Sequence, residues 1–167
     1  MATELYDLTV PVLTRALTTL AAFLDKGRKW ADEQGIAHSE LLDGRLAPDM
    51  HPLPYQIQRV SDTAKGTLVR IGGLDNVAME DNETSFEELQ ARIAKTLDFI
   101  RSVPRDKIDG REDAEVVLKT PSRDLTFTAR DYWLGFATPN LYFHVTTAYA
   151  ILRHKGVPLG KMDFLGG

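Results

Sequence analysis

The amino-acid sequence predicts an all-α protein, a bundle of four amphipathic helices with one small β-hairpin between the third and the fourth. Four separate stretches place apolar residues three and four positions apart, the spacing that gathers them on one face of a helix. Only one short region, near residues 115–127, instead shows the β-branched and alternating residues typical of strands. A length of 167 residues suits one core, so we expect a single domain over residues 1–167.

The first helix is expected over residues 9–34. Thr9 is a suitable N-cap, and Pro11 then falls in the first turn, where its missing N–H leaves no hydrogen bond unmade. Gly35 provides the stop. The apolar face consists of Val10, Leu13, Leu17, Leu20 and Leu24.

The second helix is expected over residues 53–72 and to end at Gly72-Gly73. Before it comes a connector rich in proline, in which Ser39 can cap a short helical turn ending at Leu42. The apolar face of the second helix consists of Ile57, Val60, Ala64, Leu68 and Ile71.

The third helix is expected over residues 85–102. Ser85 and Glu88 match a capping box, in which each side chain accepts a hydrogen bond from a free backbone donor, and Pro104 ends the helix. The polar stretch before it carries no periodicity and is expected to be a loop that crosses one end of the molecule.

The fourth helix is expected to start after Thr128, another suitable cap, and to end near Gly156. Pro139 lies inside its apolar pattern and should either kink one helix or separate a short helix near 129–137 from a main helix that starts at about 138. The preceding hairpin turns at Pro121-Ser122.

Composition excludes several classes of protein. With 43% hydrophobic and 26% charged residues the chain is globular, and a net charge of −4 gives no basic excess for binding nucleic acid. The absence of cysteine removes disulfides, thiolate nucleophiles and cysteine-ligated metal. No stretch approaches the roughly 18 uninterrupted apolar residues of a membrane span, and the start does not resemble a signal peptide. We therefore expect a cytoplasmic protein without a membrane partner.

The candidate functional residues lie on the second and fourth helices. Asn140 and His144 are four residues apart, so both side chains fall on one helix face and can point at one ligand or metal ion. Further ligands would have to come from near or on the second helix, where the candidates are His51, Gln56, Gln58 and Asp62.

Each of these residues also has a purely structural interpretation. His144 can be a hydrogen-bonded core histidine, Asn140 can cap the turn after Pro139, and His51 can be a loop residue. The sequence contains no G-x-S-x-G, H-E-x-x-H, E-x-x-H or phosphate-binding glycine loop, so it predicts no catalytic residue and leaves open whether the chain is an enzyme.

Three segments together resemble the DinB-like (YfiT/DinB) superfamily, in particular a bacterial and fungal branch catalogued as a domain of unknown function. They are LAPDMHPLPYQIQRVSDTAKG, EDNETSFEELQARIAKTLDFI and PNLYFHVTTAYAILRHKGVPLGKMDFLG, and the resemblance covers nearly the whole chain. It implies an up-down-down-up four-helix bundle that forms a homodimer. It also implies, for metal-binding members, one histidine on the second helix and an H-x-x-x-H pair on the fourth.

The sequence departs from that ligand pattern. Aligned by its R-x-x-G-V-P ending, the fourth helix has His144 at the second position of the pair and Asn140 at the first, and the second helix has no histidine near Gln58 to Asp62. Only one of the three expected histidines remains. Because an amide oxygen is a weak ligand for zinc-like ions, a Zn, Ni or Fe ion held by His144, Asn140 and Asp62 would be bound weakly.

We therefore expect an altered metal site and a small-molecule pocket between the second and fourth helices, lined by His51, Gln58, Asp62, Asn140 and His144. Two alternatives stay open. One is a metal-dependent thiol transferase or hydrolase that uses His144 to hold its ion. The other is a stress-response module that binds another protein through an exposed apolar helix face.

Overall fold

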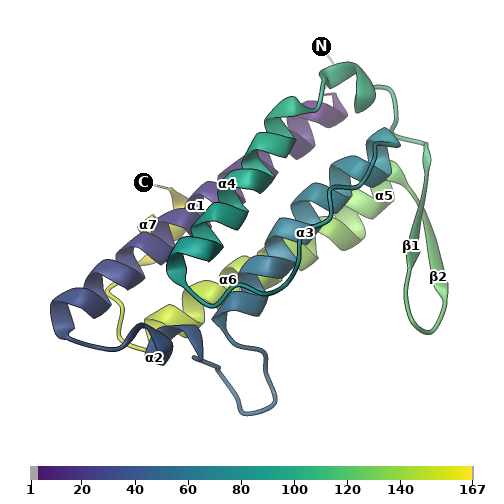
Figure 1. The fold of residues 1–167 in the computed structure, drawn as a ribbon. Helices are drawn as coiled ribbons and strands as arrows, with labels where there is room; N and C mark the ends of the chain where they lie inside the picture. The colour runs from purple at the N-terminus through teal and green to yellow at the C-terminus, as the bar shows by residue number, and fades with distance from the viewer. Residues whose placement is uncertain (1–3, 167) are drawn as a thin grey trace.

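The computed structural model describes residues 4–166 and contains four long helices (Figure 1). They are α1 (Leu5–Gln34), α3 (Leu53–Gly72), α4 (Phe86–Ser102) and α6 (Thr138–His154). The shorter elements are α2 (His38–Leu42), the 3₁₀ turn η1 (Arg105–Lys107), β1 (Glu115–Lys119), β2 (Asp124–Thr128), α5 (Ala129–Tyr132), the π-helical turn η2 (Trp133–Ala137) and α7 (Lys161–Leu165).

The four long helices form an up-down-down-up bundle. In Figure 1, α1 and α6 run in one direction and α3 and α4 run in the other, with α4 and α6 each packed on both α1 and α3. The predicted fold class, an all-α bundle with a small hairpin, is confirmed.

The segment of residues 74–85, which joins α3 to α4, runs back along the bundle (Figure 1). Its contacts with α3 appear in reverse order: Lys65 bonds to Val77, and further along Gln58 bonds to Glu83. The expectation that this loop crosses one end of the molecule was therefore wrong. Since α3 and α4 are parallel, the chain must return over the length of a helix before α4 can begin.

The start of α1 also differs from the expectation. The helix begins at Leu5, so Thr9 is not its N-cap but a buried helical residue whose Oγ1–H donates to the Leu5 carbonyl at 2.8 Å. Pro11 consequently lies inside the helix. A free backbone donor of the first turn is paired with a residue far away in the sequence, because the Tyr6 N–H donates to the Asp109 carboxylate at 2.8 Å.

The other helix boundaries lie close to those expected. At α4 the Ser85 side chain accepts from the Glu88 N–H while the Glu88 carboxylate accepts from the Ser85 N–H, which confirms the capping box. At α5 the Thr128 side chain caps as expected. At α2 the N-cap is Ala37, so Ser39 lies within the short helix and does not cap it.

The last helical region remains helical through Pro139. α5, η2 and α6 follow one another without a gap, and in the π-helical turn the Thr138 N–H donates to the Trp133 carbonyl, five residues back. Pro139 has no N–H to give to the carbonyl four residues before it, and the wider turn lies at this place. The short and main helices thus have the expected bounds, but no break separates them.

The hairpin is confirmed as an antiparallel pair, with Glu115 opposite Thr128 and Lys119 opposite Asp124. It extends beside α3 and α5 at one end of the bundle (Figure 1). Val116 is buried in the core, whereas Val117, on the other face of the strand, is 40% exposed and lies beside α3. This alternation places one strand face over α3.

The buried apolar residues form one continuous core, to which all four long helices contribute. The helix α1 is long and apolar enough to span a membrane by length and composition, with a mean hydropathy of 1.3 in its most apolar window. A core helix passes the same test, and half of this window is buried inside the bundle.

Candidate functional site

Two hydrogen bonds join α3 to α6 at the place where the altered metal site was expected. The Asn140 amide donates to Thr63 Oγ1 at 2.8 Å, and one turn further along His144 Nδ1 lies 2.8 Å from Gln56 Oε1. The Gln56 amide is oriented by its own bond to the His51 carbonyl at 3.0 Å. Since Gln56 Oε1 can only accept, His144 Nδ1 carries the hydrogen and Nε2 holds the lone pair.

The surroundings keep His144 neutral. Burial lowers the pKa of His144 from 6.5 to about 4, and the positive charges of Arg59 and His51 add to the effect. At neutral pH the ring is therefore uncharged and works as a hydrogen-bonding link between the two helices.

The residues around His144 do not fit a metal ion of the kind that the resemblance implies. Asn140 is paired with Thr63, and His51 is an exposed residue whose ring stacks on Tyr55 with ring centroids 3.8 Å apart. Across the described part of the chain, residues 4–166, no three or more His, Asp or Glu side chains are grouped in a way that would hold a metal ion. His144 is thus a single imidazole without the two further strong ligands that a zinc-like ion requires.

Gln58 and Asp62 lie on a different face of α3, toward α4 and the 74–85 segment. The Gln58 amide donates to Glu83 at 2.9 Å, and Asp62 contacts Arg92 of α4 at 3.0 Å. Four of the five residues predicted for one pocket are therefore divided between two faces of α3. Asn140 and His144 of α6 lie against one face, and Gln58 and Asp62 project from the other.

Arg92 is the centre of this second face. Its side chain is 2% exposed and makes ion pairs with Asp62, Asp81 and Glu83 at 2.9 to 3.0 Å. Although burial opposes it, hydrogen bonds from Arg92 and Gln58 lower the pKa of Glu83. The cluster attaches the 74–85 segment to both α3 and α4.

A cavity of about 900 Å³, open to solvent on one side, lies next to this cluster and is lined by residues of α3, the 74–85 segment and β1. We call it the α3 cavity. Its lining residues are Arg59, Asp62, Lys65, Gly66, Val69, Arg70, Asn76, Ala78, Met79, Val117 and Lys119. The lining combines four cationic side chains and one carboxylate with apolar walls, and Asp62 is the only one of the five predicted site residues that lines it.

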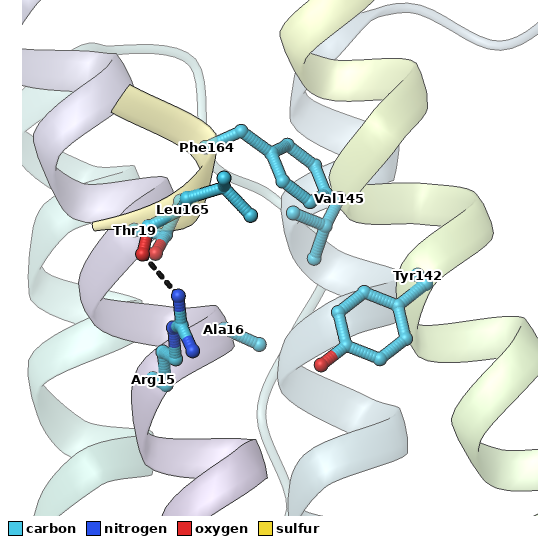
Figure 2. Close-up of a pocket in the computed structure, with 7 residues that line it drawn as sticks. All are labelled: Arg15, Ala16, Thr19, Tyr142, Val145, Phe164 and Leu165. Atoms are coloured by element: carbon cyan, nitrogen blue, oxygen red, sulfur yellow. Dashed lines mark hydrogen bonds between the residues drawn. The ribbon is translucent and has the colours of Figure 1, made fainter. Parts of the chain in front are cut away.

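A smaller cavity of about 100 Å³ lies between α1, α6 and α7 (Figure 2). Figure 2 shows Tyr142 and Val145 of α6 facing Arg15 and Ala16 of α1, with the guanidinium of Arg15 donating to the Leu165 carbonyl. A volume of this size admits a few waters or a short alkyl group, so it is less suited to hold a metabolite than the α3 cavity.

The residues that sequence reasoning missed are Arg92, Lys65 and Arg70. Arg92 lies between Leu89 and Ile93 and next to the apolar face of α4, and Lys65 directly follows Ala64 on α3. A charged residue beside such a face is a signal for a buried polar cluster, because unpaired charges are rarely buried. The acidic partners of Arg92 lie in the aperiodic 74–85 segment, whose path along the bundle the sequence does not reveal.

Comparisons with known proteins support the fold and the family. A family described as "Domain of unknown function (DUF1993)" matches residues 5–165. A DinB family member protein from Shewanella denitrificans, solved by crystallography, is 37% identical, with a TM-score of 0.88. The match covers 98% of this chain and 92% of that one. No curated protein matches.

The family match spans the four helices, the hairpin and both faces of α3 described above. The structural neighbour, at 37% identity, carries the same architecture over almost its full length. The chain therefore belongs to the DinB-like proteins, within the family described as domain of unknown function DUF1993.

Proposed function

We propose that this chain is a metal-independent binding protein that holds a small molecule in the α3 cavity. The observation that carries the proposal is the cavity itself, whose volume of about 900 Å³ falls in the range of small-molecule sites. Its lining supplies both apolar contact and fixed polar groups. The cavity lies elsewhere than the pocket expected between α3 and α6. There, Asn140 and His144 form hydrogen bonds with Thr63 and Gln56 across the two helices.

The rigidity of the walls supports this proposal. The Arg92 ion pairs attach the 74–85 segment to α3 and α4, and Lys65 donates to the Val77 carbonyl on the same segment. A preformed cavity lowers the cost of ordering the protein when a ligand binds.

A fragment screen followed by ¹H–¹⁵N NMR tests the proposal. We expect binding fragments to shift the amide signals of residues 65–70 and 117–119 together. Ala78→Trp, which fills the cavity from the 74–85 segment, should abolish these shifts, whereas Ala94→Trp at an exposed position of α4 should preserve them. Fragments that shift no cavity signal, or that bind Ala78→Trp equally well, would refute the proposal.

A homodimer in the cytoplasm completes the proposal. Support comes from Phe143 and Tyr142 on α6, which are 58% and 40% exposed, and from Leu165 on α7. Neighbouring exposed apolar side chains of this size are typical of protein interfaces. The same surface supports a second candidate, the stress-response interaction module. A pull-down with this chain as bait, and Phe143→Ser as the control, shows whether the surface binds a second copy of the chain or a different protein.

Metal-dependent thiol transfer or hydrolysis is the candidate that the side chains around His144 support least. For untagged protein purified without chelator, we expect elemental analysis to find no stoichiometric Zn, Ni or Fe. Stoichiometric metal that disappears in His144→Ala would reverse this conclusion and place a metal centre on α6.

A further inference from the structure

We infer that the α3 cavity selects a small organic oxyanion, a phosphate or carboxylate group attached to a short apolar body. This inference rests on the proposed function and names the chemical class of its ligand. The side chains that line the cavity carry a positive net charge, opposite in sign to that of the whole chain.

The buried ammonium of Lys65 is the first observation. Lys65 is 5% exposed, and its nearest carboxylate is Asp62 at 3.5 Å. Asp62 also contacts Arg59 at 2.9 Å and Arg92 at 3.0 Å, and these two arginines pair in addition with Asp81 and Glu83. Lys65 therefore has the longest carboxylate contact of the three cations. The ammonium also donates to the Val77 carbonyl, and an anion beside Lys65 would add the close charge partner that a buried cation favours.

Arg70 and Lys119 are the second observation. Within residues 4–166, neither side chain forms an ion pair, whereas Arg59 is paired with both Asp62 and Asp81. Arg70 donates to the Tyr132 hydroxyl at 3.1 Å, which holds its planar group in place and leaves further N–H donors for an oxyanion.

Gly66 is the third observation, because it provides the space in which Arg70 lies. A Cβ atom at Gly66 would collide with Arg70 Nη1, the far end of a flexible side chain, so another residue there would shift the guanidinium from this position. Glycine inside a helix is unfavourable relative to alanine. Gly66 thus leaves room for the position that Arg70 takes at the cavity.

The remaining wall defines the rest of the ligand. Val69, Ala78, Met79 and Val117 contribute apolar surface beside the cations. A small anion alone would leave this surface in contact with water, whereas an alkyl group on the anion would cover it. The cavity therefore matches an amphipathic anion better than a free inorganic ion.

Isothermal titration of the full chain tests the inference with four probes: hexyl phosphate, hexanoate, inorganic phosphate and neutral hexanol. We expect hexyl phosphate or hexanoate to bind, and the stronger of the two identifies phosphate or carboxylate as the preferred group. Inorganic phosphate should bind at least about tenfold more weakly than the alkyl anion that binds, and hexanol should not bind measurably.

Three variants locate the site. Arg70→Gln and Lys65→Met should each weaken binding of the alkyl anion at least about tenfold, the usual loss for a hydrogen bond to a charged group. Gly66→Ala keeps every charge but displaces Arg70, so it should weaken binding while the melting temperature stays the same or rises. Arg101→Gln, on an exposed part of α4, is the matched control and should bind as the unchanged chain does.

The outcomes separate this inference from the proposed function. If hexanol shifts the NMR signals of the cavity as strongly as the alkyl anions do, the cavity binds ligands but does not select anions, and the inference is wrong. Anion binding that persists in both Arg70→Gln and Gly66→Ala would also overturn it. If no probe or fragment binds, both proposals fail together.

Discussion

His144 shows how the meaning of one residue changes with its neighbours. Beside two further histidines its position would suit a metal ion. Here the Gln56 side chain accepts the Nδ1 hydrogen of His144, and the Asn140 amide donates to Thr63. The same two positions on α6 thus provide a link between helices.

Protonation of His144 makes the stability of the protein depend on pH. In the unfolded chain the ring takes up a proton as the pH falls through about 6.5, whereas in the folded chain it does so only at about 4. The unfolded state binds more protons between these values, so the free energy of unfolding should decrease as the pH falls from 6.5 to 4, by at most about 3 kcal/mol.

Urea unfolding at several pH values, compared with His144→Gln, measures this contribution. The variant should show a shallower decrease over the same range, because its side chain does not titrate. An NMR titration that gives His144 a pKa near 6.5 would contradict the buried, neutral ring.

Arg92 is the side chain whose loss should destabilise the fold most among the polar residues described. Arg92→Met removes the cation shared by Asp62, Asp81 and Glu83 and leaves these carboxylates without their buried partner. We expect the free energy of unfolding to fall by about 3 kcal/mol in chemical denaturation.

Arg101→Met is the matched control for that measurement. Arg101 also pairs with an aspartate on α4, but its side chain is 65% exposed, so its loss should change the free energy of unfolding by less than about 0.5 kcal/mol. Equal losses in the two variants would show that the Arg92 cluster contributes nothing beyond a surface ion pair.

The helix α4 follows the 74–85 segment and is the one of the four long helices with a side-chain cap at its N-terminus, the full capping box. Ser85→Ala should lower the free energy of unfolding by about 1 kcal/mol, because the Glu88 N–H loses its acceptor. Ser85→Thr keeps a hydroxyl at the same place and should restore most of the loss. Thermal denaturation of the three proteins followed by circular dichroism measures the difference.

The helices were predictable from the sequence because each carries an apolar face and its own local stop or start signals. Residues 53–72 and 85–102 were placed within a residue of α3 and α4. The start of α1 was missed because its first turn is satisfied by Asp109, which lies 103 residues away. Local patterns do not contain such a contact.

The site was less predictable than the fold. Asn140 and His144 were correctly placed on one face of α6, but their partners Thr63 and Gln56 turn that face into a structural link. The α3 cavity depends on the path of the 74–85 segment, and this segment has no periodicity from which a path can be inferred. Only Asp62 was identified in advance.

The whole bundle is expected to form a homodimer through the exposed apolar residues of α6. Phe143→Ser should convert the dimer to a monomer in analytical ultracentrifugation, because it removes the largest exposed apolar group from that surface. Leu46→Ser changes an apolar residue of similar exposure in the connector after α2 and should leave the dimer intact. A chain that is already monomeric before mutation would refute the expected pairing.

The packing of α1 has a consequence for synthesis on the ribosome. The helix packs mainly on α4 and α6, and α6 ends at residue 154, far from Gln34. At ordinary rates of translation, its apolar face waits on the order of ten seconds for the last of these partners. A helix apolar enough to pass for a membrane segment therefore stays uncovered while the chain grows, so we expect α1 to be the segment most prone to aggregation during synthesis.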